Sequence, residues 1–375
     1  MISVLREISD LRKGKPIIID YKNSNRYRIV LKELDGTRTG YYFSTPIYNI
    51  HTHKAIDLKF KQCGDIIYAN GSNANITIAK DVRLENDEGY CILRANKSLT
   101  HYSECLLKYN NDILLPATNG IVYKAGCSTG TEFSFELEVG KPFMEIRAND
   151  KCFALMSETF RPFVSVSCIG TVNASGEIIA PAMVKHQKIS DRKYKLTVTP
   201  CSGLGKWIMF EFNLYEPKLI QDTTVESLNP KTNNAFGCTA FIGDTIQFGE
   251  QWLYSRLNFA NFSELTNKRI NKAILHIPKY NFPNIELSAF KVSARFCSFG
   301  SNWENKIASS STIAETQITD KYQNLDITNL FVDKNGYLTH FEGLILKPQV
   351  KKSGFSAIAT GDSYYSPQIF EINFK

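Results

Sequence analysis

Long apolar runs are missing from this sequence of 375 residues. A membrane-spanning helix needs about 20 consecutive, mostly apolar residues, and no segment of the chain comes close to this length. Residues 1–14, MISVLREISDLRKG, also lack the continuous apolar core of a secretory signal peptide. We therefore expect no membrane insertion, and we expect synthesis in the cytoplasm without a signal peptide.

Clustered charge of one sign is missing as well. The 44 Lys and Arg exceed the 37 Asp and Glu, for a net charge of +7, but no block of five or six like charges occurs. Proteins that bind nucleic acids typically gather their basic residues on one face or along one helix. We therefore expect no nucleic-acid partner.

The cysteines and histidines form no pattern typical of a disulfide framework or a metal site. The nine cysteines include no CxxC pair, and their odd number argues against a disulfide framework, so we predict reduced, buried thiols. His51 and His53 would share one face of a strand, yet no third ligand follows at a spacing typical of zinc. The prediction is two exposed histidines, no metal ion and no cofactor.

Local motifs of catalysis are scarce too. The chain has no GxSxG nucleophile motif, and GLGKW at residues 203–207 lacks the Ser or Thr that follows the Lys of a phosphate-binding loop. Glu136 and Glu138 alternate with Phe135 and Leu137, which is typical of the solvated face of a strand rather than of a glycosidase pair. We predict no catalytic residue and no enzymatic activity.

Alternation of apolar and polar residues is what the sequence does contain, from about residue 16 to the end. Such alternation over four to eight residues predicts half-buried strands, and Gly and Asn between the segments predict tight turns. The predicted fold class is all-β, with antiparallel β-sandwich domains in tandem and a short N-terminal helix. The clearest strand segments are residues 16–21, 26–34, 132–139, 193–200, 206–215, 254–259, 270–280, 323–332 and 366–374.

The one predicted helix lies at residues 1–14, where Ile2, Leu5, Ile8 and Leu11 recur at a spacing of three. A helix of a dozen residues is marginal in water by itself. It must therefore dock either on its own domain or on a partner copy, and the sequence favours neither.

Turn-rich and polar stretches divide the predicted strands into domains. A β-rich sandwich or barrel is expected over residues 15–140, and the Gly-Lys-Pro at 140–142 separates it from residues 141–220. This second stretch is either another domain or a continuation of the first. Residues 221–237 are polar and aperiodic, which predicts a linker, and residues 238–375 form the last predicted sandwich.

The last third of the chain resembles the DNRLRE-type β-sandwich domain, which is related to carbohydrate-binding modules of family 96. No single motif carries this resemblance, and the literal DNRLRE string is absent; the order and spacing of several segments carry it together. These segments are TAFIGDT from 239, WLYSRLNFANFSEL from 252, KRINKAILHIP from 268, SNWENKI from 301, YQNLDITNLFVDK from 322, GLILKPQ from 343 and SAIATGDSYYSPQIFEINF from 356.

This resemblance implies a non-catalytic module of surface-displayed proteins, some of which bind polysaccharide. Sugar sites on such sandwiches use exposed aromatic rings, and the candidates here are Trp252, Tyr254, Trp303, Tyr364 and Tyr365. Packing in the core or at an edge is the alternative for Trp252 and Trp303. Tyr364 and Tyr365 lie in a GDSYYSP loop, which predicts that at least one of them is exposed.

Three hypotheses for the function follow. The first is a structural or adhesive component of a displayed assembly, such as a phage tail or baseplate appendage, that forms a homo-oligomer and binds other assembly proteins. The second is a dedicated carbohydrate-binding protein that recognises polysaccharide through its aromatic residues. A spore-surface structural protein is a further alternative to the phage assembly. The third hypothesis, a polysaccharide-degrading enzyme, is kept only because such modules accompany enzymes.

Overall fold

The computed structural model confirms the all-β fold class. Strands make up about 57% of the chain and helix about 5%, and every strand pair in the described part is antiparallel, as in β19 with β20. The structure describes residues 4–49, 54–55, 58–63, 66–70, 75–79, 81–86, 89–95, 101–103, 106–109, 112–127, 131–141, 143, 145–159, 162–214, 219–257, 259–282, 285–339, 342–350 and 353–375.

The chain forms two compact units that interleave along the sequence. Unit 1 consists of Met1–Val4, Tyr48–Pro217 and Phe236–Cys238, and unit 2 consists of Leu5–Ile47, Lys218–Ala235 and Thr239–Lys375. Each unit has its own large hydrophobic core.

Unit 1 is a sandwich of two large sheets, because side chains from both sheets meet in one core. The eight-stranded sheet has the order β19 (Ala182–Ser190), β20 (Lys193–Pro200), β14 (Phe133–Val139), β9 (Gly89–Arg94), β8 (Asp81–Asn86), β7 (Asn75–Ala79), β6 (Ile66–Asn70) and β5 (Phe60–Cys63). The nine-stranded sheet has the order β10 (His101–Ser103), β11 (Leu106–Tyr109), β12 (Asp112–Ala117), β13 (Gly120–Gly126), β21 (Trp207–Leu214), β17 (Pro162–Val172), β16 (Cys152–Met156) and β15 (Glu145–Ala148), with β18 (Ile178–Ala180) on β17. The short strands β3 (Tyr48–Asn49) and β4 (Lys54–Ala55) pair with each other.

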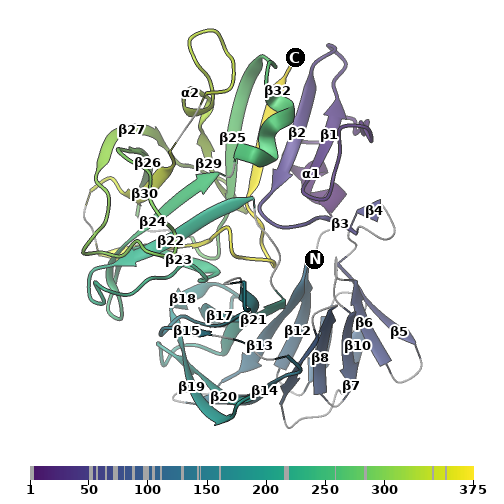
Figure 1. The fold of residues 1–375 in the computed structure, drawn as a ribbon, viewed down its shortest axis with the longest axis vertical. Coiled ribbons are helices and arrows are strands. Elements are labelled where there is room, and N and C mark those ends of the chain that lie inside the picture. Colours follow the sequence, from purple (N-terminus) through teal and green to yellow (C-terminus); the bar gives the residue numbers. More distant parts are fainter. Residues whose placement is uncertain are drawn as a thin grey trace. The chain divides into compact units, whose positions relative to one another are not determined.

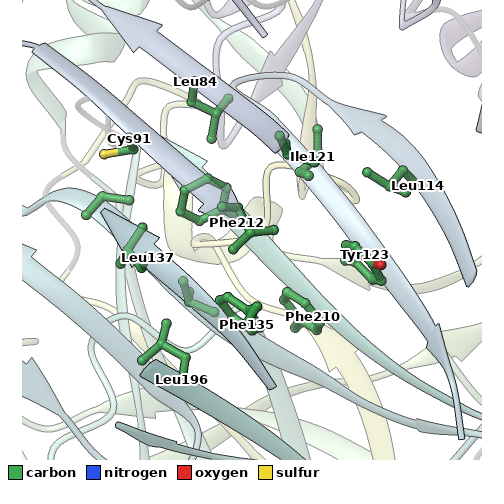
Figure 2. Close-up of a cluster of buried hydrophobic side chains, with 14 of the residues drawn as sticks. Leu84, Cys91, Leu114, Ile121, Tyr123, Phe135, Leu137, Leu196, Phe210 and Phe212 are labelled. Atoms are coloured by element: carbon green, nitrogen blue, oxygen red, sulfur yellow. The ribbon is translucent and has the colours of Figure 1, made fainter. Parts of the chain in front are cut away.

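Aromatic rings fill the centre of the unit 1 core (Figure 2). The ring of Phe210 stacks on Tyr123 at 5.3 Å and on Phe135 at 5.1 Å between centroids. These rings come from three strands in which every second residue points inward, as the burial of alternate residues in β14 shows. Alternation in the sequence therefore places the large side chains on one face of each sheet.

No domain boundary falls near residue 140. β14 ends at Val139, yet it pairs with β20, whose Lys193–Val198 lie opposite Phe133–Glu138. The Gly-Lys-Pro break therefore marks a turn within a sandwich, and residues 141–217 continue the domain that begins at residue 48.

Unit 2 is also built of two sheets that share a core. The six-stranded sheet has the order β1 (Arg28–Lys32), β2 (Arg38–Phe43), β32 (Ile369–Phe374), β25 (Ile270–Pro278), β29 (Tyr322–Asp326) and β28 (Gln317–Ile318). The seven-stranded sheet contains β27 (Ser309–Glu315), β26 (Leu287–Val292), β30 (Leu344–Pro348), β24 (Gly249–Leu257), β23 (Thr239–Thr245) and β31 (Gly354–Ala359), with β22 (Ile220–Glu226) on β24. Two short helical segments, η1 (Phe259–Leu265) and α2 (Thr328–Phe331), complete it.

The two ends of the chain fold together in unit 2, which corrects the expected domain division. β2 pairs with β32 along its whole length, from Arg38 opposite Phe374 to Phe43 opposite Ile369 (Figure 1). The hairpin of β1 and β2 thus extends the C-terminal sandwich rather than beginning a domain at residue 15. Local alternation shows that a strand exists but not which strand it pairs with, so this pairing could not be predicted.

The expected linker at residues 221–237 begins with a strand: residues 221–226 belong to β22, whereas residues 227–237 contain no strand. β22 pairs with β24 from Ile220 opposite Leu257 to Glu226 opposite Gln251, and Asp222, Thr223 and Thr224 are all buried. Its polar side chains concealed the strand, because they lie inside unit 2 rather than in solvent.

The N-terminal helix α1 (Val4–Leu11) forms as predicted, and the choice left open for its docking is resolved in favour of its own chain. Ile8 is fully buried, the Tyr322 hydroxyl donates to Glu7, and Arg12 just beyond the helix pairs with Glu33 at 2.6 Å. No helix in the described part of the chain is long and apolar enough to cross a membrane.

Candidate functional site

The seven-stranded sheet of unit 2 carries a second hydrophobic cluster on the face that does not belong to the main core. Leu253 and Leu346 face the main core, so their strand neighbours Tyr254 and Ile345 face the other way. Residues 293–308, which connect β26 to β27, contribute Phe296 and Ile307 to this second cluster. An apolar patch is therefore built on the outer side of the sheet.

Two of the three tryptophans of the chain, Trp252 and Trp303, meet at the rim of this cluster. Their ring centroids lie 5.2 Å apart with an interplanar angle of 56°. Both side chains are half-buried, and Trp252 Nε1 donates to Glu250 Oε1 at 2.9 Å. Each indole thus rests on the cluster while part of its surface stays accessible.

Two lysine ammonium groups lie over these rings. Lys306 Nζ is 4.1 Å from the ring centroid of Trp303, and Lys347 Nζ is 4.6 Å from that of Trp252 and 4.4 Å from that of Phe290. Each contact is a cation–π interaction. Burial lowers the pKa of Lys347 from its ordinary value. We call these five residues the aromatic–lysine face.

Side-chain contacts hold both lysines in place. Lys306 Nζ donates to the carbonyl of Trp303 at 3.1 Å, and Lys347 Nζ donates to Ser309 Oγ at 2.9 Å. Fixed ammonium groups beside an aromatic surface can bind a ligand that combines an apolar face with an acidic group. Glu250, which accepts the hydrogen bond of Trp252, partly offsets their charge.

Tyr254 lies beneath this face rather than on it, which corrects its expected role. Its side chain is fully buried, and its hydroxyl donates to the carbonyl of Ile307 at 2.5 Å. Burial raises the pKa of this phenol. The ring supports the cluster and offers no accessible surface to a sugar.

Tyr364 and Tyr365 also differ from the expectation, because neither is exposed. Tyr364 is only 1% exposed and Tyr365 is half-buried. Their loop, residues 360–368, is polar yet packed: Ser363 Oγ bonds the hydroxyl of Tyr280 at 3.2 Å, and the backbone N–H of Gln368 donates to Ser44 Oγ. The loop appeared exposed in the sequence because the partners of its polar groups lie far away along the chain.

The two glutamates that were weighed as a catalytic pair lie on a charged strand surface, as predicted. Glu136 pairs with Lys193 and Glu138 pairs with Arg94, each at 2.6 Å. Residues 203–206 of the GLGKW stretch lie in the turn between β20 and β21, and Trp207 begins β21.

The sequence also led to predictions for the cysteine thiols and for His51 and His53. His51, His53 and Cys105 fall outside the described residues. The eight described cysteines form no disulfide bond, and Cys63 and Cys297 are exposed, so the buried-thiol prediction holds only for some of them. Burial raises the pKa of Cys91 to about 12. Among the residues that the structure describes, no group of His, Cys, Asp or Glu is arranged to hold a metal ion.

Sequence reasoning missed three members of the aromatic–lysine face: Phe290, Lys306 and Lys347. Lys306 could have been found, because it follows Trp303 by three residues in the same connection. Phe290 and Lys347 come from β26 and β30, and only the pairing of these strands with each other and with β24 brings them to Trp252.

No family model matches the sequence, and no curated protein is similar enough to be a relative. The function must therefore be argued from the side chains of the site.

Proposed function

We propose that this protein is a non-catalytic, adhesive component of a surface-displayed assembly, such as a phage tail or baseplate appendage, and that it binds polysaccharide through the aromatic–lysine face of unit 2. The observation that carries the proposal is the pairing of Trp252 and Trp303 at the rim of an apolar cluster with a lysine over each ring. The family resemblance of residues 238–375 supports the same ligand class.

Charge indicates which polysaccharides this face would favour. Unit 2 contains 25 Lys and Arg against 19 Asp and Glu, whereas unit 1 contains 19 against 18. Nearly all of the positive excess of the chain thus belongs to the unit that carries the aromatic–lysine face. We infer a preference for acidic polymers, whose carboxylates or phosphates accept hydrogen bonds from Lys306 and Lys347 while their sugar rings stack on the indoles.

A glycan array with the full chain tests this function. We expect acidic polysaccharides to be retained more strongly than neutral ones, and retention to fall as salt is raised from about 0.05 to 0.5 M because the charges are screened. Trp303→Ala should abolish retention. An array without any retained glycan would contradict the adhesive function.

A purely structural protein, of a virion or a spore surface, is the second candidate. The same lysines favour a structural role, because an ammonium group over each indole ring is also expected where these side chains only stabilise the fold. In that case Trp303→Ala lowers stability and changes no binding. Size-exclusion chromatography with light scattering tests the homo-oligomer that both candidates share, and a monomer at all concentrations would contradict it.

A further inference from the structure

A pocket of about 360 Å³ lies in unit 2, within the range of about 300–1,000 Å³ typical of small-molecule sites. Four segments build it, one of which contributes Leu219, just before β22. The loop before β1 and the start of β1 supply Asn25, Tyr27 and Arg28, β2 supplies Tyr42, and η1 supplies Ser263 and Glu264.

Aromatic packing fixes the position of η1 at this pocket. Phe262, in the middle of η1, is fully buried, and its ring lies 4.8 Å from that of Tyr42 between centroids. The contact holds Ser263 and Glu264, which follow Phe262 directly, against the hairpin of β1 and β2. The pocket therefore depends on the N-terminal hairpin being part of unit 2.

The charged groups in the pocket neutralise each other. Glu264 Oε1 pairs with Arg28 Nη1 and accepts a hydrogen bond from the Tyr42 hydroxyl at 2.7 Å. The Arg28 and Glu264 side chains are only 13% and 22% exposed. Burial and the Glu264 charge raise the pKa of Tyr42 well above its ordinary value, so its hydroxyl stays a donor. Because the two opposite charges lie together, the pocket offers no net charge to a charged ligand, which favours a neutral one.

Several polar groups around the pocket have hydrogen-bonding capacity left over. Both bonds of Glu264 reach Oε1, and Arg28 uses Nε for the carbonyl of Asn23 and Nη1 for Glu264. Within the described part of the chain, Glu264 Oε2, Arg28 Nη2, Asn25 Nδ2 and Ser263 Oγ make no hydrogen bond. Two donors, one acceptor and one hydroxyl thus remain next to the ring of Tyr27, a combination that suits adjacent hydroxyl groups of a sugar.

We propose that this pocket binds a single neutral sugar unit, with Arg28 and Glu264 on adjacent hydroxyls. The proposal shares only its ligand class with the proposed function, because none of the pocket residues belongs to the aromatic–lysine face. The pocket would add recognition of one sugar unit to an adhesive surface that otherwise selects for charge.

Titration of the full chain with methyl glycosides of glucose, galactose, mannose and N-acetylglucosamine, followed by ligand-observed NMR, tests the proposal. At least one glycoside should bind with a Kd on the order of 1 mM, the strength that a few hydrogen bonds provide. Glu264→Gln keeps the side-chain volume and should weaken binding at least tenfold. Ser263→Phe fills the pocket from an exposed position and should abolish binding, whereas Ser311→Phe, on exposed strand β27, is the matched control and should leave it unchanged.

The outcomes separate this site from the aromatic–lysine face. Trp303→Ala should leave glycoside binding unchanged, and Ser263→Phe should leave polymer retention on the glycan array largely intact. The pocket proposal is overturned if no neutral glycoside binds, if binding survives Ser263→Phe, or if glucuronate or inorganic phosphate binds at this pocket in place of the neutral glycosides.

Discussion

Unit 1 and unit 2 are both two-sheet β structures with ion pairs and with lysine over tryptophan, but in unit 2 two tryptophans and two lysines lie together. In unit 1, charges on neighbouring strands pair across the sheet surface, as in Lys193 with Glu136 and Arg94 with Glu138. In unit 2, Lys306 and Lys347 lie over aromatic rings, and Glu250 near Lys347 offsets part of their charge. Surface charges that pair with each other leave few unpaired charges for a ligand. Ammonium groups beside aromatic surfaces remain available to bind a ligand. On this basis we propose a scaffold role for unit 1 and the binding role for unit 2.

The tryptophans sharpen this comparison. All three lie under a lysine, because Lys124 Nζ is 4.2 Å from the ring centroid of Trp207 in unit 1. Trp207 lies under Lys124, whereas Trp252 and Trp303 contact each other, Lys306 lies over both rings, and Lys347 lies over Trp252. The unit 1 pair is therefore a natural control for the candidate site.

The largest expected effect concerns how the two units are assembled from the sequence. A fragment of residues 48–217 should fold by itself, whereas a fragment of residues 218–375 should not, because it lacks β1 and β2 and leaves the edge of β32 unpaired. Circular dichroism and thermal unfolding of both fragments measure this. Addition of a peptide of residues 5–47 should restore a cooperative transition to the second fragment; cooperative folding without it would contradict the interleaved unit.

A core substitution tests whether the units unfold separately. Phe210→Ala removes a ring that stacks on both Tyr123 and Phe135, and the cavity should lower the free energy of unfolding of unit 1 by about 3–5 kcal/mol. Chemical denaturation should show this transition moving while that of unit 2 stays. A single transition that moves as a whole would show that the units are coupled.

The Arg12–Glu33 pair gives unit 2 a pH dependence. Arg12 lowers the pKa of the Glu33 carboxyl, so the pair stabilises the fold above the ordinary glutamate pKa of about 4.3. This contribution is lost as the pH falls through the lowered pKa. Glu33→Gln should therefore destabilise unit 2 by about 1–3 kcal/mol at pH 7, and the variant and the natural chain should converge in acid. A difference that persists at pH 2 would contradict this explanation.

These tests also show what the sequence could and could not predict. The alternation that places Phe135 and Leu137 in a core was visible, and so was the amphipathic helix around Ile8. The pairing of β2 with β32 was not visible, because register between the two ends of a chain leaves no local pattern. For the same reason Trp252 and Trp303 could be predicted as separate candidates but not as a contacting pair. The pocket around Glu264 could not be predicted at all.

The smallest expected effects come from single surface contacts. Lys306→Met should lower the stability of unit 2 by about 0.5–1 kcal/mol through loss of the cation–π contact but should weaken binding to an acidic polymer several-fold. Lys193→Met in unit 1 should change stability by less than about 0.5 kcal/mol and leave binding unchanged. Equal losses of binding in the two variants would mean that net charge, rather than the aromatic–lysine face, attracts the polymer.

The central claim is that the binding surface belongs to unit 2, and the matched tryptophans test it most directly. Affinity electrophoresis of Trp303→Ala and Trp207→Ala through gels that contain polygalacturonate measures how strongly the acidic polymer retards each variant. We expect Trp207→Ala to be retarded like the natural chain and Trp303→Ala to migrate as it does in a gel without polymer. Retardation of Trp303→Ala at the natural level, or its loss in Trp207→Ala alone, would contradict the claim.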